Sequence, residues 1–248
     1  MTKTLEICVD SVTAALTAAA AGADRIELCE NLAQGGVTPS AGKIRLAKAA
    51  LSIPVFVLVR PRPGDFHYSP AEFDLLLLDI EQAKALGADG IVAGLTGPDG
   101  ELDEDLTARL VAAANPLPLT FHRAFDHLRD PLAAIDTLAR LQVVRILTAG
   151  GQGQAADQLD QLQRYLDQAA GRLEILAGGG VRPHNIGALT AIPGLREFHS
   201  AARMIQPSPV AHYAKAQLGF SEERIQQELK WATVDPEMIR AMKRALTD

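Results

Sequence analysis

The chain has 248 residues, of which 48% are hydrophobic, 22% are charged and 4% are aromatic, and its formal net charge is -6. This composition predicts a globular protein of one large or two small domains, long enough to fold without disulfides. The negative charge argues against nucleic-acid binding, no apolar run reaches the ~20 residues of a membrane span, and the N-terminal MTKTLEICVD lacks a signal-peptide pattern.

Eight short runs rich in Val, Ile and Leu predict β-strands along the chain. They lie near residues 4–9, 24–29, 54–60, 89–94, 117–123, 144–149, 173–178 and 196–200. Each run is followed by a turn and a segment with helical periodicity. This alternation is typical of a parallel sheet assembled from β-α units.

Several helices have recognisable start signals. Ser69, Pro70 and Glu72 form the pattern of a capping box with proline at the first helical position. The four further expected N-caps are Ser11, Ser40, Asp103 and Asp130. The related segments AAGADRI (20–26) and ALGADGI (85–91) each place a glycine just after a helix, where a left-handed residue is expected.

Eight β-α units predict an α/β fold of the (β/α)8 or TIM-barrel class over residues 1–218. An open doubly wound sheet is the alternative, but the first β-α turn, CVDSVTA, lacks a Gly-x-Gly-x-x-Gly fingerprint. Residues 219–248 are predicted to form a tail of two helices packed on the barrel. Trp231 is expected to pack between these helices or against the barrel.

Side chains alternate along a strand, so parity predicts which of them face the barrel interior. The aliphatic residues of each strand should face the helices. The opposite parity places a set of polar residues inside, which comprises Glu6, Glu27, Arg60, Thr120, His122, Thr148, Glu197 and His199. Enclosed charges are costly unless they are paired, so these groups should form a polar network.

Four of these residues are candidate catalytic groups at the carboxyl ends of the strands, where (β/α)8 enzymes carry their active sites. They are Glu27, Arg60, His122 and His199. A Glu6–Arg pair is interpreted as structural, whereas two histidines that titrate near neutrality favour a functional site.

The loops after the strands add candidate anion-binding groups. Arg60 and Arg62 in RPRPGDFHYS, together with Arg123, suit a carboxylate or phosphate. Thr148 lies at the end of the sixth strand, and Gly178, Gly179 and Gly180 follow the seventh, where (β/α)8 proteins commonly bind phosphate. No organic cofactor is predicted.

The two cysteines, Cys8 and Cys29, share the inward parity near the ends of neighbouring strands. Since such strands are ~4.8 Å apart, both sulfurs could bind one soft metal ion such as Cu(I). The alternative is a pair of inert, buried thiols. Reduced thiols agree with the expected cytoplasmic location.

Several longer segments resemble the CutC family: LEICVDS, GADRIELCENLAQGGVTPS, VRPRPGDFHYS, TFHRAFD, RILTAGG and HSAAR. The resemblance runs from about Leu5 to Arg203, and it implies a (β/α)8 barrel, a cytoplasmic location and a link to copper homeostasis, with Cys8 and Cys29 as the proposed Cu(I) ligands. The chain departs from the family at Ala149, where the family usually has serine, and in the segment VAGLT.

Two functions therefore remain open. The first is a copper-binding protein that holds Cu(I) through Cys8 and Cys29. The second is a lyase, isomerase or hydrolase that acts on a small phosphorylated or carboxylated molecule, with His122 or Glu27 as general acid or base. Schiff-base chemistry is disfavoured because no lysine ends a strand. The expected partners are a copper ion or a small anionic metabolite, with a homodimer as a further possibility.

Overall fold

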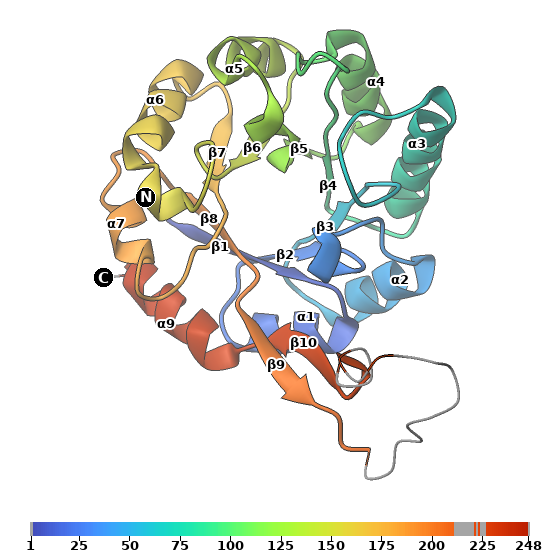
Figure 1. Cartoon of the computed structure of the whole chain (residues 1–248), viewed down its shortest axis with the longest axis vertical. Coiled ribbons are helices and arrows are strands. Elements are labelled where there is room, and N and C mark those ends of the chain that lie inside the picture. Colours follow the sequence, from blue (N-terminus) through green and yellow to red (C-terminus); the bar gives the residue numbers. More distant parts are fainter. Residues whose placement is uncertain (1, 211–220, 222, 224–226, 248) are drawn as a thin grey trace.

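The computed structural model describes residues 2–210, 221, 223 and 227–247, and it contains a closed barrel of eight parallel strands (Figure 1). The strands are β1 (Thr4–Val9), β2 (Arg25–Leu28), β3 (Val55–Leu58), β4 (Gly90–Ala93), β5 (Leu119–Phe121), β6 (Arg145–Thr148), β7 (Glu174–Ala177) and β8 (Glu197–Ser200). They pair in sequence order, and β8 pairs with β1. The predicted (β/α)8 fold is confirmed, and closure of the ring excludes the open sheet.

Helices surround the barrel (Figure 1). They are α1 (Val12–Ala20), α2 (Ala41–Ala50), α3 (Pro70–Ala85), α4 (Glu104–Ala114), α5 (Pro131–Arg140), α6 (Leu159–Ala169), α7 (Ile186–Thr190) and α9 (Pro236–Thr247). Short 3-10 helices are η1 (Leu32–Gln34), η2 (Arg123–His127) and η3 (Ala155–Asp157). No helix in the described part of the chain has the length and apolarity needed to cross a membrane.

The predicted helix starts are present. Ser69 accepts a hydrogen bond from the Glu72 backbone N–H, and the Glu72 carboxylate accepts one from the Ser69 N–H, which completes the capping box of α3. The side chains of Ser11, Ser40, Asp103 and Asp130 cap α1, α2, α4 and α5. Gly22 and Gly87 have φ angles of +103° and +86°, as expected for residues that follow a helix in the left-handed region.

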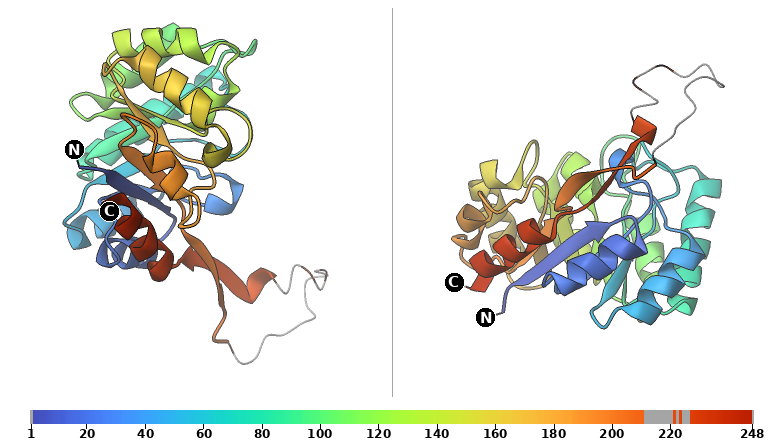
Figure 2. Two further views of the ribbon diagram at one scale, coloured as in Figure 1. Left: turned by 90° about the vertical axis from the view of Figure 1, so that its left-hand side faces the viewer. Right: turned by 90° about the horizontal axis from the view of Figure 1, so that it is seen from below.

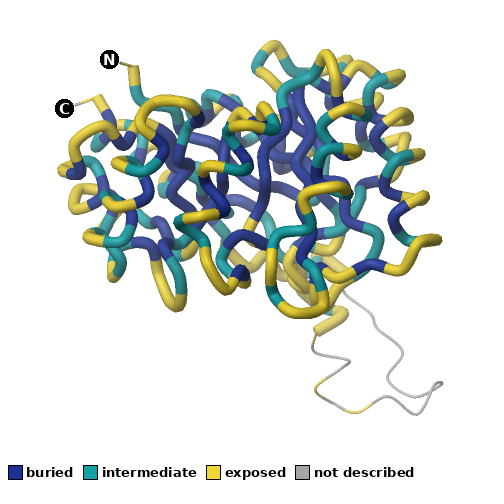
Figure 3. Tube along the Cα trace, turned by 90° about the horizontal axis from the view of Figure 1, so that it is seen from above, coloured by how far each residue is buried: buried dark blue, intermediate teal, exposed yellow. Residues whose placement is uncertain are grey.

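The core lies between the strands and the helices. Leu5, Ile7 and Val9 of β1 are at most 1% exposed and pack in this layer with Ile26 and Leu28. The buried strands run through the middle of the molecule, and the exposed residues lie on its outer surface (Figure 3). Burial of each such aliphatic side chain stabilises the fold by roughly 1.5–3 kcal/mol. The aliphatic side chains of each strand therefore face the helices, and the alternate side chains point into the barrel.

The C-terminal region differs from the predicted pair of helices. The described residues do not include most of the first predicted helix. They also do not include residue 218, where the barrel was predicted to end. Lys230–Val234 form a strand, β10, which pairs antiparallel with β9 (Arg203–Pro207). This two-stranded ribbon extends away from the barrel (Figure 2). Trp231 lies on it and is 48% exposed, so the prediction that it packs between helices is wrong.

The last helix, α9, lies in the ring between α7 and α1 (Figure 1). Its buried residues are Ile239, Met242 and Leu246, and Lys243 forms an ion pair with Asp24, just before β2. The C-terminal helix thus covers the part of the barrel where β8 meets β1. It stabilises the closure that brings the first and last strands together.

Candidate functional site

Two cysteines, a glutamate and a histidine gather near the carboxyl ends of β1, β2 and β8. Cys8 lies opposite Glu27 in the β1–β2 register, and Cys29 follows β2. The Sγ atoms of Cys8 and Cys29 are 3.7 Å apart, and the Cys8 Sγ lies 3.0 Å from Glu27 Oε1. Candidate ligand atoms of Cys8, Glu27 and His199 all lie within 4.8 Å of one another. We call Cys8, Cys29, Glu27 and His199 the thiol cluster.

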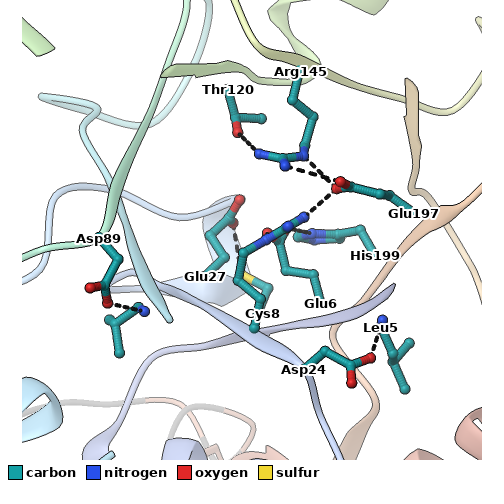
Figure 4. A network of polar contacts seen from close by, with 12 residues as sticks. Leu5, Glu6, Cys8, Asp24, Glu27, Asp89, Thr120, Arg145, Glu197 and His199 are labelled. Atoms are coloured by element: carbon teal, nitrogen blue, oxygen red, sulfur yellow. Dashed lines mark hydrogen bonds and ion pairs between the residues drawn. The ribbon is translucent and has the colours of Figure 1, made fainter. Parts of the chain in front are cut away.

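Glu6 holds His199 in this cluster. The two residues are neighbours in the β1–β8 register, and His199 Nδ1 lies 2.7 Å from Glu6 Oε1 (Figure 4). Burial alone would lower the pKa of His199, but the carboxylates of Glu27 and Glu6 outweigh it and raise the pKa. Burial raises the pKa of Glu6, but Arg25 and His199 together lower it to about 2. With Nδ1 engaged by Glu6, Nε2 is the ring nitrogen left for a ligand.

The pKa values of Cys8 and Glu27 in the thiol cluster are both raised. The contact with Cys29, then burial and the nearby Glu27, raise the pKa of Cys8 well above its usual value. Burial likewise raises the pKa of Glu27, whose Oε2 atom is buried without a hydrogen-bond partner. Two sulfurs and an imidazole are a donor set that suits a soft ion, and metal–sulfur bonds of ~2.3 Å can span two sulfurs 3.7 Å apart. The residues present therefore fit a soft metal ion.

A chain of ion pairs fills the barrel next to this cluster. Arg25 contacts both Glu6 and Glu197 at 2.5 Å. Arg145 pairs with Glu197 and donates to Thr120 Oγ1 (Figure 4). All five residues are buried. The predicted interior network is present in part: it contains Glu6, Thr120 and Glu197, whereas Arg60, His122 and Thr148 have other partners. Its paired charges fix the position of Glu6.

Arg60 and His122 belong to a second group of side chains, around Phe66. The Arg60 guanidinium lies 4.8 Å from the Phe66 ring centre, and the His122 ring centre lies at the same distance. Arg60 is 1% exposed and donates to the carbonyls of Gly36 at 2.8 Å and Gly64 at 2.5 Å. Its observed contacts hold the loops that follow β2 and β3.

His122 lies just beyond β5 and caps η2. Its Nδ1 accepts a hydrogen bond of 3.2 Å from the Ala124 N–H, and its Nε2 is buried without a partner. Burial, then the charges of Arg60 and Arg123, lower the pKa of His122 to about 3. The expectation that this histidine titrates near neutrality is therefore wrong. The ring is neutral and capping is its observed role, because burial beside two guanidiniums disfavours its cation.

A pocket of about 490 Å³ opens beside both groups. Its walls include Arg123, Asp126, Thr148, Gly178, Gly179 and His199. Thr148 donates to the Asp126 carboxylate, which also accepts a hydrogen bond of 2.9 Å from the Ala149 N–H. Thr148 and the glycines after β7 are thus close to Arg123 and His199. Gly180 is not part of the wall, and its carbonyl accepts a hydrogen bond from Asn185.

Arg62 is directed away from the predicted anion site. Its guanidinium donates to Glu72 Oε1 at 2.5 Å and to Asp65 Oδ1 at 3.0 Å, and its side chain is 36% exposed. Hydrogen bonding to these carboxylates raises the pKa of Arg62. Two acidic groups already occupy the guanidinium, so Arg62 is not the free anion ligand that its proximity to Arg60 in the sequence indicated.

The predicted catalytic set of four therefore divides in two. Glu27 and His199 lie with the cysteines, whereas Arg60 and His122 lie around Phe66, and no hydrogen bond or ion pair between described residues joins the two halves. Sequence reasoning missed Phe66 and the positioning role of Glu6. The position of Glu6 in its strand predicted that it faces the barrel interior. Its pairing with His199 could not be predicted, because it depends on the register between the first and last strands.

The fold and the thiol cluster define a (β/α)8 barrel protein with a candidate site for a soft metal. The CutC family profile matches residues 3–204. A human copper homeostasis protein cutC homolog is 46% identical over 204 residues, which cover 82% of this chain and 75% of the human protein. A family protein CutC from Chromobacterium violaceum is 39% identical and covers 99% of both chains.

A solved structure agrees with these sequence relatives. The crystal structure of a Streptococcus agalactiae protein assigned to CutC superposes with a TM-score of 0.77 at 33% identity, and it covers 80% of this chain and 98% of that one. The chain belongs to the CutC family.

Proposed function

We propose that this protein binds Cu(I) through Cys8 and Cys29 and that it serves copper homeostasis in the cytoplasm. The observation that carries the proposal is the pair of buried Sγ atoms 3.7 Å apart, beside an imidazole whose Nδ1 is already held by a carboxylate. Thiolates and imidazole are favoured ligands of soft copper. The names of the human and mouse relatives, which refer to copper homeostasis, support the same conclusion.

Each residue of the thiol cluster has a distinct part in this proposal. Cys8 and Cys29 are the sulfur ligands, and His199 contributes Nε2 as a third ligand. Glu6 positions His199 through Nδ1, in the arrangement by which carboxylates commonly orient metal-binding histidines. Glu27 Oε1 lies 3.0 Å from Cys8 Sγ, where it can accept the proton that the thiol must lose.

An anaerobic Cu(I) titration against a chromogenic chelator tests the proposal. We expect one Cu(I) per wild-type chain and a large loss of affinity in both Cys8→Ser and Cys29→Ser. His199→Gln should lower the affinity by roughly 10–100-fold, whereas His127→Gln, which changes a histidine of the same pocket outside the thiol cluster, should not. Equal affinities in the wild type and both serine variants would reject the site.

A second candidate is an enzyme, of lyase, isomerase or hydrolase type, that acts on a small phosphorylated or carboxylated molecule. The pocket that joins Arg123 to His199 at the carboxyl ends of the strands favours it. Glu27, whose pKa is raised by burial, is a better acid or base here than the neutral His122. A thermal-shift screen of small organic anions followed by product analysis tests this candidate, and it fails if no compound is converted.

A further inference from the structure

Two arginines share one aromatic ring without an acidic partner. The guanidinium carbons of Arg60 and Arg123 lie 4.8 and 4.9 Å from the centre of Phe66. Within the described residues, neither side chain forms an ion pair, and Arg60 bonds only to backbone carbonyls while its Nε is buried without a partner. Arg60 is buried, whereas Arg123 is exposed. A buried cation is costly when no opposite charge accompanies it, so the two neighbouring guanidiniums favour an anion beside them.

Arg123 also lines the pocket, so a ligand in the pocket can reach its guanidinium. Its guanidinium makes no hydrogen bond to the described part of the chain, so its donors are free. Both terminal nitrogens of Arg60 donate to loop carbonyls, so Arg60 contributes mainly its positive charge to this region. The backbone of Gly179, on the same wall, has a φ of +96°, and its N–H donates no hydrogen bond to a described residue.

Asp126 is the acidic group on the wall of this pocket, and its charge acts on Arg123 without forming an ion pair. The Asp126 carboxylate lines the pocket, but it accepts hydrogen bonds from the Thr148 hydroxyl and the Ala149 N–H. Arg123 and Asp126 are not within ion-pair distance. The Arg123 guanidinium is therefore a fork-shaped cation with free donors at the pocket, and its shape matches a carboxylate or phosphate.

We propose that Arg123, supported by Arg60, binds the carboxylate or phosphate group of a small molecule at this pocket. The pocket volume of about 490 Å³ suits a metabolite, and His199 on its wall places the remainder of the molecule beside the thiol cluster. This inference extends the second candidate function and does not depend on copper binding.

Calorimetric titration with sodium phosphate and with sodium succinate, against sodium chloride at equal ionic strength, tests the site. Wild type and Arg129→Gln should bind at least one of the two anions, and Arg123→Gln should bind it about 10-fold more weakly or worse. Arg129 is a matched control because it lies on the loop after η2 with a 67% exposed side chain paired to Glu101. Binding of only one anion identifies the headgroup.

No binding beyond chloride, or equal binding by Arg123→Gln, overturns the proposal. Should that variant not fold, the Arg123 Nε–H resonance of the wild-type protein provides the same test: it should shift on addition of the bound anion, and an unchanged resonance contradicts the site. Cys29→Ser protein separates the two proposals, since it should lose Cu(I) affinity and keep anion binding.

Discussion

Cys8 lies in β1 and Cys29 directly follows the neighbouring strand β2, and their buried Sγ atoms lie 3.7 Å apart. Cys8 is also adjacent to His199 and Glu27, contributed by β8 and β2. This proximity depends on the closed ring, because β1 is hydrogen-bonded to β2 on one side and to β8 on the other.

The interior ion pairs should be essential for stability. Replacement of Arg145 by Met leaves Glu197 buried with fewer partners, and we expect a loss of about 3–5 kcal/mol in the free energy of unfolding. Arg140→Met removes an exposed pair with Glu104 and should cost about 0–1 kcal/mol. Urea unfolding of both variants measures the difference, and equal losses would show that the interior network does not stabilise the barrel.

Glu6 should make the protein sensitive to acid. Its pKa is lowered to about 2 in the folded chain, so its contribution is fully present above its ordinary pKa of 4.5 and is lost as the pH falls toward 2. This shift corresponds to a free energy on the order of 3 kcal/mol. Urea unfolding between pH 5.5 and 3 should show a steeper decline for the wild type than for Glu6→Gln, and parallel curves would contradict the assignment.

His122 should remain neutral across the physiological range. Because its pKa is lowered to about 3, its ring resonance should not titrate between pH 5 and 8 in an NMR experiment. In the unfolded chain the His122 ring binds a proton as the pH falls through about 6.5, whereas in the folded chain it stays neutral until about pH 3. The contribution of His122 to the free energy of unfolding therefore declines as the pH falls below 6.5. A titration midpoint near 6.5 in the folded protein would restore His122 as an acid–base candidate.

Gly179 should tolerate substitution poorly. Its φ is +96°, and an added Cβ would lie 2.9 Å from the Cβ of Ala149. We expect Gly179→Ala to lower the free energy of unfolding by about 1–3 kcal/mol. Gly187 in α7 has open space at its Cβ position, so Gly187→Ala should stabilise by about 0.5–1 kcal/mol. Thermal unfolding distinguishes the two, and a loss in the second variant would contradict the packing.

Much of the barrel could be predicted from the chain because two physical patterns agree. Aliphatic residues at every second position of each strand face the helices, and the caps at Ser69 and Asp130 mark where helices begin. The same parity predicted that Cys8, Glu27 and His199 lie inside. The ribbon was missed, although KWATV in β10 is rich in residues that favour strands.

The division of the site could not be predicted in the same way. Parity gives the direction of a side chain but not its partner, and the partners of Arg60 are carbonyls of loops whose paths the sequence does not determine. The neutral state of His122 depends on its burial beside Phe66 and two arginines. Glu6 and His199 are 193 positions apart, and only closure of the ring makes them neighbours.

X-ray absorption spectroscopy of protein loaded anaerobically with one Cu(I) per chain tests the copper proposal most directly. We predict a first shell with two sulfur scatterers and one nitrogen scatterer, and loss of one sulfur in Cys29→Ser. A first shell of nitrogen and oxygen alone, or a wild-type spectrum unchanged by the loss of either cysteine, would contradict it.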